Sequence, residues 1–367
     1  MIRADNVGSF LRPKELLDAR LGDAPVKKLH EIEDKHILRV LGKQKELGFK
    51  IFTDGELRRA GFMGDFTDSV TGLGSGEVVK RTWHGSDEME QEARPRSTMP
   101  GFVVERIKQT KRLTAHEVPF LKQHAPGPVK MTLPSATQFP AIAYKKGRSE
   151  KAYPTHSDFL RDVTAIIRDE VKALADEAIS YIQIDAPRYS YYLDPKWREY
   201  LRGETGMELD ALLDEAVAAD NACFAVGKRP GNTLAIHLCR GNNRSHWYAR
   251  GGYDAIAEKL FNELKVDEFL LEYDDERSGS FEPLRLVPKD KSVVLGLVSS
   301  KNPELESVDV LARRIDEAKK YIPLERLALS PQCGFASTLE GNLLTEDEQW
   351  AKLKLVADVA AKVWGST

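Results

Sequence analysis

The sequence has few of the features that hold secreted or membrane proteins together. Only three cysteines, Cys223, Cys239 and Cys333, occur in 367 residues, and such an odd, sparse set argues against a disulfide framework. No apolar run approaches the roughly 18 residues of a membrane span. The first residues carry no apolar stretch of signal-peptide length. We therefore expect a cytoplasmic protein, not bound to a membrane, whose cysteines are available for metal binding or catalysis.

An excess of one charge is also missing. The 54 Lys and Arg residues nearly balance 57 Asp and Glu, for a formal net charge of −3, so there is no electrostatic basis for binding nucleic acid. The glycines of TGLGSGE (71–77) have the wrong spacing for a dinucleotide fingerprint, and no long helical pattern follows. The expected partners are small molecules, and no redox cofactor is indicated.

Short apolar runs instead alternate with longer amphipathic ones. The strand candidates are 4–9, 49–54, 101–107, 128–134, 180–186, 233–239, 267–273, 292–298 and 326–332. Apolar residues recur at helical spacing in 26–48, 157–178, 208–228, 251–265, 304–321 and 345–363. This alternation predicts an α/β fold, a (β/α)8 TIM barrel forming one domain over 1–367. Nine candidates are one more than such a barrel holds, so we expect one of them to lie outside it, and 101–107 is the weakest strand pattern. The polar, glycine-rich region 70–100 is expected to be an excursion from the barrel.

Unusual side chains stand at the carboxyl ends of several strand candidates, where such barrels build their active sites. His237 and Cys239 are two residues apart on one strand, so both point to the same face. Glu272 ends the run FLLE, and Cys333 follows LALSPQ. Two thiolates, an imidazole and a carboxylate form a tetrahedral set suited to zinc. Because this donor set is electron-rich, it favours alkyl transfer to a bound thiol over activation of water.

Simpler explanations stand beside this one. Cys223 lies within the helical pattern 208–228 and reads as a small core hydrophobe. A single histidine near a strand end is often a satisfied core residue, and a strand-end glutamate can be a cap or an ion-pair partner. The pair His237 and Cys239 does not decide between these interpretations by itself. Its occurrence together with Glu272 and Cys333 favours zinc.

Several stretches together resemble one known family. They are VGSF (7–10), DGE (54–56), IQIDAP (182–187), IHLC (236–239), LLEYDDERSGSFEPL (270–284) and SPQCGF (330–335). In this order they resemble the catalytic domain of cobalamin-independent methionine synthase, and more closely its short single-domain relatives. The full-length synthase has an additional amino-terminal half, for which we expect no room in this chain.

The resemblance implies that zinc is bound by His237, Cys239, Glu272 and Cys333. It also implies a site for the amino-acid part of homocysteine, formed by Gly8, Ser9, Glu56 and Asp185. The two carboxylates would take the ammonium group and Ser9 the carboxylate, which suits the chemistry of both charged groups. Asp185 ends the strand candidate 180–186, and Glu56 follows 49–54, so both belong at the same end of the barrel.

The chain departs from the family where the methyl donor would bind. Tyr191 stands where the family usually has a pterin-contacting glutamate, and the segment 133–139 lacks the family's tryptophan. Val298 occupies the position of a histidine thought to donate a proton. A methyl group on a tertiary amine is a poor electrophile until the nitrogen is protonated, so these departures weaken methyltetrahydrofolate as the donor.

Replacements for the missing groups stay open at this level. His246 is either an acid or a surface-loop residue. The aromatic residues Tyr189, Tyr191, Tyr192 and Trp247 form either a different donor pocket or ordinary packing. Arg94, Arg96 and Arg244 could meet a carboxylated donor near the barrel mouth.

The sequence therefore predicts a zinc-dependent S-methyltransferase that methylates a small thiol, homocysteine, to give methionine. One alternative is a zinc-dependent alkyltransferase that uses another electrophile or thiol, for example in epoxide ring opening. Another is a non-catalytic protein that binds zinc or homocysteine.

Overall fold

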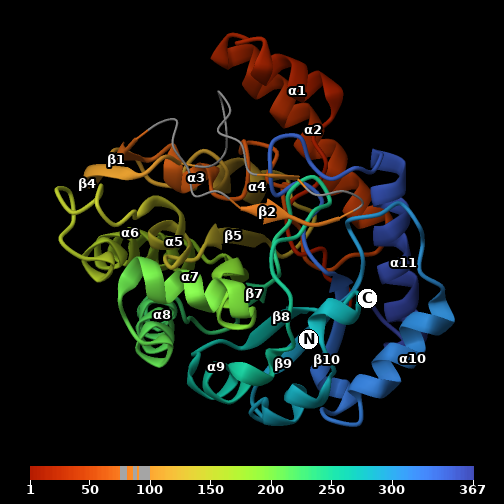
Figure 1. The fold of residues 1–367 in the computed structure, drawn as a ribbon. Coiled ribbons are helices and arrows are strands. Elements are labelled where there is room, and N and C mark those ends of the chain that lie inside the picture. Colours follow the sequence, from red (N-terminus) through yellow and green to blue (C-terminus); the bar gives the residue numbers. More distant parts are fainter. Residues whose placement is uncertain (75–80, 86–88, 91–99) are drawn as a thin grey trace.

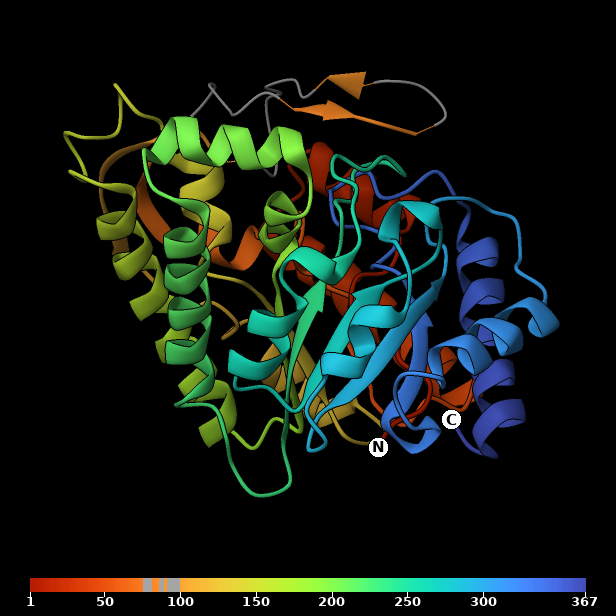
Figure 2. The same ribbon diagram turned by 60° about the horizontal axis from the view of Figure 1, so that its bottom comes forward.

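The computed structural model describes residues 1–74, 81–85, 89–90 and 100–367. Its centre is a six-stranded parallel sheet in the order β10-β9-β8-β7-β6-β5 (Figures 1 and 2). The strands are β5 (Lys130–Pro134), β6 (Tyr181–Asp185), β7 (Thr233–Leu238), β8 (Glu268–Glu272), β9 (Ser292–Val298) and β10 (Leu327–Pro331). Since each pairs in parallel with the next, all their carboxyl ends meet at one end of the sheet.

Two irregular segments close this sheet into a TIM barrel. Ala4 forms a parallel bridge with Leu329 at one edge, and Phe52 forms one with Val129 at the other. The two segments meet where the Phe10 N–H donates to the Gly55 carbonyl at 3.0 Å. The prediction of a (β/α)8 barrel is confirmed. The predicted strands 4–9 and 49–54 are present only as isolated bridges, because the backbone leaves the extended conformation close to them.

The predicted strand 101–107 lies outside the barrel, as expected. It appears as β4 (Val103–Gln109), which pairs antiparallel with β1 (Val70–Leu73). Two further short strands, β2 (Thr82–Trp83) and β3 (Met89–Glu90), pair with each other. Figure 2 shows this pair lying across the end of the barrel to which the parallel strands point. The excursion expected near 70–100 is thus partly seen, and its remaining residues lie outside the described ones.

Helices surround the sheet. They are α1 (Lys14–Leu21), α2 (Val26–Glu46), α3 (Gly64–Thr67), α4 (Val118–His124), α5 (Gln138–Ala143), α6 (His156–Asp176), α7 (Pro195–Thr205), α8 (Leu209–Phe224), α9 (Ala257–Glu263), α10 (Val308–Ala318) and α11 (Glu346–Trp364). Short 3-10 turns are η1 (Pro187–Tyr192), η2 (Tyr253–Ala255), η3 (Glu276–Ser278), η4 (Glu282–Leu286) and η5 (Leu324–Arg326). Within the described part of the chain, no helix is both long and apolar enough to cross a membrane.

The helix predicted over 251–265 is shorter than expected. Gly251 and Gly252 precede the turn η2, and Ile256 leaves helical geometry at φ −129°, so the regular helix α9 begins only at Ala257. Helix α11, in contrast, begins where the helical pattern 345–363 predicts. The Glu348 N–H donates to Thr345 Oγ1 at 3.2 Å, and the Thr345 N–H donates to the Glu348 carboxylate at 2.7 Å.

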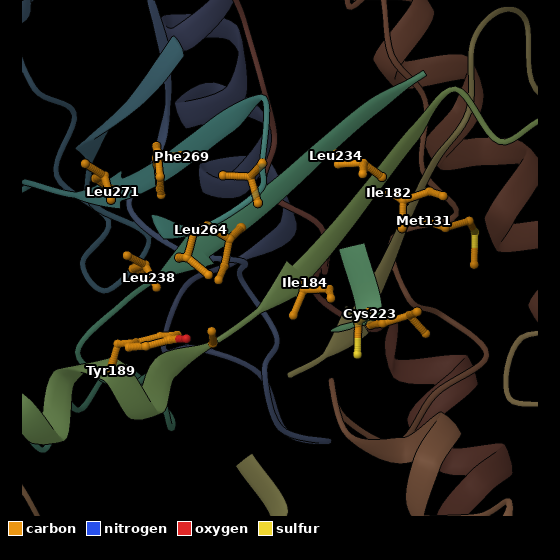
Figure 3. Close-up of a cluster of buried hydrophobic side chains, with 14 of the residues drawn as sticks. Met131, Ile182, Ile184, Tyr189, Cys223, Leu234, Leu238, Leu264, Phe269 and Leu271 are labelled. Atoms are coloured by element: carbon orange, nitrogen blue, oxygen red, sulfur yellow. The ribbon is translucent and has the colours of Figure 1, made fainter. Parts of the chain in front are cut away.

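The outer face of the sheet and the helices form one apolar core. Figure 3 shows strand residues such as Ile182, Ile184 and Leu234 turned toward the helices. Cys223 of α8 lies among them, fully buried, with its Sγ 3.8 Å from the Thr164 carbonyl. The interpretation of Cys223 as a core hydrophobe therefore fits its surroundings.

The inner face of the barrel changes character along its length. Small and apolar residues fill its middle: Val7, Ile51, Tyr181, Ala235, Leu270, Val294 and Ala328. At the amino-terminal end of the strands, Lys130 Nζ lies 2.6 Å from Asp5 Oδ1, and the Tyr181 hydroxyl donates to Glu268 at 2.9 Å. Strand alternation places Asp185, His237 and Glu272 on this same inner face at the opposite end.

Glu268 makes stability depend on pH. Burial raises the pKa of Glu268 from 4.5 to about 7, so between these values the folded protein keeps a proton that the unfolded chain releases. Folding stability therefore falls as pH rises through this window.

The variant Glu268→Gln can still accept a hydrogen bond from Tyr181 but does not titrate. Between pH 5 and 7.5, we expect the wild type to lose about 2 kcal/mol more than this variant. Urea unfolding at both pH values measures the difference, and parallel pH profiles would contradict it.

Candidate metal and substrate site

Three predicted ligands come together at the carboxyl end of the barrel. His237 lies in β7, Cys239 follows that strand, and Cys333 follows β10. Their ligand atoms lie within 4.8 Å of one another, and all three residues are buried. Neither ring nitrogen of His237 has a hydrogen-bond partner. An orphaned imidazole beside two thiols is a donor set that fits zinc.

The pKa shifts of these three groups place negative charge on Cys333, which favours binding of a cation. The pKa of Cys333 is well below its usual range, because the Cys239 thiol donates to it and His237 lies beside it. The pKa of Cys239 is raised in turn by its bond to Cys333 and by burial. Burial lowers the pKa of His237, but the negative Cys333 next to it raises it overall. A metal ion bound here would displace the shared protons.

Glu272, the fourth predicted ligand, ends β8 but lies outside this compact group of three. Its Oε1 accepts from Arg277 Nε at 3.0 Å and Nη2 at 2.6 Å, and its Oε2 accepts from the Arg240 N–H at 2.8 Å. Burial opposes ionisation of Glu272, but Arg277, Lys301 and Arg240 hold its pKa below the usual value. Its role as a ligand stays a prediction. Three close ligands with a fourth position to fill are typical of catalytic zinc sites.

Two carboxylates predicted to contact the substrate lie beside the cluster. Asp185, at the end of β6, pairs in register with His237. Burial raises the pKa of Asp185 to about 7, with Glu56 and Cys333 adding to the effect and His237 opposing it. Glu56 accepts from Thr132 Oγ1 at 2.8 Å through Oε1, while its buried Oε2 has no partner. Unused carboxylate oxygens next to one another are suited to an ammonium group.

Gly8 and Ser9 lie between these carboxylates and the Cys333 loop. A Cβ on Gly8 would lie 2.9 Å from Glu56 Oε1, so only glycine lets this backbone approach so closely. The Ser9 hydroxyl accepts from the Ala336 N–H at 3.3 Å. A Cβ on Gly334 would lie 2.1 Å from Ser9 Oγ. Gly8 thus lies against Glu56, and Ser9 lies against the loop that carries Cys333; their role in binding substrate stays a prediction.

Backbone strain accompanies this arrangement. Val7 and Glu56 both have left-handed backbones, at φ 66° and 58°, and such a conformation is unusual for a β-branched residue. Val7 is held there because its N–H donates to Asp5 Oδ1 at 2.7 Å and its carbonyl accepts from Gln183 Nε2 at 2.9 Å. Each such residue costs about 1–3 kcal/mol, and in this chain the strain falls next to the predicted substrate site.

The residues with open assignments now have definite places. Tyr191 is fully buried and stacks on Trp197, with ring centroids 4.3 Å apart. Tyr189 also packs internally, and its hydroxyl donates to Asp220. The interpretation of His246 as a surface-loop residue is wrong, because it is buried and its Nδ1 lies 2.6 Å from the Arg244 carbonyl.

The other residues with open assignments lie in several places. Tyr192 is half-buried, Trp247 pairs with the segment carrying β2, and Arg244 lies in the loop after β7. Val298, where the family has its histidine, is fully buried at the end of β9. Arg94 and Arg96 lie outside the described residues.

Sequence reasoning missed the arginines around the site. Arg240 directly follows Cys239, and Arg277 lies in the charged stretch after Glu272. Charged residues next to strand ends look like solvent-exposed loops in a sequence. The adjacency of Arg240 to a predicted ligand was the one available signal.

Comparison with known proteins agrees with the geometry. A family model described as the catalytic domain of cobalamin-independent synthase matches residues 6–362. The uncharacterised protein YxjH of Bacillus subtilis is 38% identical over 99% of this chain and 94% of its own length. Methionine synthase of Pyrococcus abyssi is 24% identical over 89% of this chain and 84% of its own length.

A solved structure extends the comparison to the fold. A protein from Listeria monocytogenes, assigned as a vitamin-B12-independent methionine synthase, superposes with a TM-score of 0.72 at 27% identity. The match covers 99% of this chain and 98% of the other. The protein therefore belongs to the cobalamin-independent methionine synthase family, whose catalytic domain it resembles over nearly its whole length.

Proposed function

We propose that this protein transfers a methyl group to the sulfur of homocysteine, giving methionine. The observation that carries the proposal is the buried group of His237, Cys239 and Cys333, with Asp185 and Glu56 beside it. A thiol-binding metal site next to an ammonium-binding site is what a thiol amino acid requires. Membership of the methionine synthase family supports the same reaction class.

His237, Cys239 and Cys333 would hold zinc, with Glu272 close enough in the fold to be the fourth ligand. Zinc bound there supplies the Lewis acidity that keeps a thiol ionised, and so nucleophilic, at neutral pH. Arg277 and the Arg240 N–H keep Glu272 charged and oriented. This explains why a buried carboxylate at the end of β8 is retained.

The remaining residues bind and orient the acceptor. Asp185 and Glu56 would take its ammonium group, and Ser9 with the backbone at Gly8 would take its carboxylate. With both charged groups fixed, the thiolate faces the donor in one orientation. The new S–C bond forms as the bond from methyl to the donor atom breaks, without a covalent enzyme intermediate.

The first variant to test is Cys333→Ser. Because a neutral hydroxyl is a far weaker zinc ligand than a thiolate, we expect zinc content to fall well below stoichiometric while circular dichroism and unfolding remain cooperative. Cys223→Ala is the matched control, since it removes a buried thiol from α8 and should retain zinc. Metal analysis of the purified proteins measures this. Full zinc occupancy in Cys333→Ser would contradict the assignment of the ligands.

The reaction itself can be tested directly. Zinc-loaded protein is incubated with homocysteine and, separately, methyltetrahydrofolate in mono- and polyglutamyl forms, a methylated corrinoid, and methylthio or methylsulfonium compounds. We expect methionine from at least one donor. Absence of methionine from every donor, together with homocysteine failing to perturb a cobalt-substituted site, would contradict the proposed function.

The acceptor residues predict a specific kinetic effect. In Asp185→Asn one of the two negative groups facing the ammonium is lost, so KM for homocysteine should rise about tenfold or more. A thiol of the same length without the amino group should be used equally poorly by both proteins. Zinc content should be unchanged in this variant. An equal loss for both thiols would show that Asp185 acts on something other than the ammonium.

A further inference from the structure

Two buried arginines meet at a single tyrosine hydroxyl near the site. Arg81 precedes β2, and Arg188 lies in the turn η1 that follows β6. Arg81 Nε donates to the Tyr191 hydroxyl at 2.9 Å, and Arg188 Nη1 donates to the same oxygen at 2.6 Å. Arg81 is 2% exposed and Arg188 6%. Two cations are therefore held together out of water.

No carboxylate pairs with either guanidinium among the residues that the structure describes. Arg81 Nη1 and Nη2 are buried without a hydrogen-bond partner. Burial and the neighbouring Arg188 both lower the pKa of Arg81. Because a buried and uncompensated charge is costly, this arrangement calls for an anion.

Two other buried arginines have polar partners for their guanidinium groups. Arg59 lies 2.8 Å from carboxylate oxygens of both Asp65 and Glu117. Arg240 donates to the carbonyls of Gly251 and Ser278. Arg81, with two buried nitrogens that lack a partner, differs from both of them.

The pair also lies close to the proposed metal centre. Arg188 lies over the Tyr248 ring at 5.1 Å, and it lies near enough to Cys239 for an ionised thiolate there to raise its pKa. Arg188 Nε donates to Gln138 Oε1 at 2.7 Å, which ties it to the residues following β5. The arginines thus lie at the carboxyl ends of the parallel strands, as the active site does.

The segment that carries Arg81 is anchored to the loop after β7. The His84 N–H donates to the Trp247 carbonyl at 2.6 Å, and the Trp247 N–H donates back at 2.9 Å. Figure 2 shows β2 lying over this end of the barrel. β2, which Arg81 directly precedes, thus lies at the same end of the barrel as the proposed metal centre.

We propose that Arg81 and Arg188 bind an anionic group, a carboxylate or a phosphoryl group, on the substrate that donates the alkyl group. The assignment rests on the proposed function, in which Ser9, Glu56 and Asp185 already match the charged groups of the acceptor. A donor is the remaining reactant.

Direct anion binding tests the site without requiring turnover. Zinc-loaded wild type, Arg81→Gln and Arg168→Gln are melted in sodium sulfate and in sodium chloride of equal ionic strength. Arg168 is an exposed residue of α6 that forms an ion pair with its neighbour Asp169, so its variant measures the general effect of sulfate. We expect sulfate to stabilise wild type and Arg168→Gln equally, and Arg81→Gln less. Arg81→Lys should recover part of the response.

Stability without added anion separates this role from a structural one. Removing an uncompensated buried charge should leave Arg81→Gln at least as stable as wild type in chloride. A strongly destabilised Arg81→Gln with the same sulfate response as wild type would overturn the proposal.

The affinity for homocysteine and the KM for the donor together show which substrate carries the anionic group. Homocysteine binding to the cobalt-substituted protein should be the same in wild type and Arg81→Gln. KM for the active donor should rise about tenfold to a hundredfold in the variant. A tenfold loss of homocysteine affinity would instead assign the arginines to the acceptor carboxylate and overturn the donor assignment. If no donor gives methionine but sulfate still distinguishes the variants, the anion site stands and the proposed reaction fails.

Discussion

Parallel register at the carboxyl end of the barrel is the constraint on which the site depends. Asp185 lies opposite His237, and Glu272 lies opposite Gly296, because neighbouring strands run in the same direction and end at the same level. Side chains two residues apart then share the inner face. Gly296 has no room for a side chain, since a Cβ there would lie 2.8 Å from the Gln332 Cα. The ends of several strands thereby converge within a few ångströms without any long loop to position them.

Burial determines which partners the converging groups need. Away from water, each charge needs a specific partner, and Glu272 has one in Arg277. Among the buried groups of the described residues that lack a hydrogen-bond partner are the His237 ring nitrogens, Glu56 Oε2 and the terminal nitrogens of Arg81. In the proposed reaction, the unpaired imidazole, carboxylate and guanidinium would bind a metal ion, an ammonium group and an anion respectively. The chemical type of each unpartnered group thus indicates which kind of ligand it would bind.

The acceptor and donor sides of the site differ in how closely they follow the family. On the acceptor side, Gly8, Glu56 and Asp185 occupy the places that the family resemblance implies, with strained backbone at Val7 holding them. On the donor side, Val298 and Tyr191 are both fully buried. Gly241, at φ 94°, allows Tyr248 to pack where a Cβ would lie 2.3 Å from its ring. Aromatic rings and arginines surround Tyr191 on this side of the barrel end.

The sequence by itself determined the barrel, the strand ends and the ligand candidates, because strand parity and helix period are local properties that a few consecutive residues reveal. His237 and Cys239 share a face for that reason alone. Only the tertiary structure decided that Glu272 is held by Arg277, that His246 is buried, and that residues 4–9 form a bridge rather than a regular strand. It also brought Arg81 to Tyr191, which is 110 residues away in the chain. Such contacts depend on how distant segments pack, and the residues between them carry no periodic signal of it.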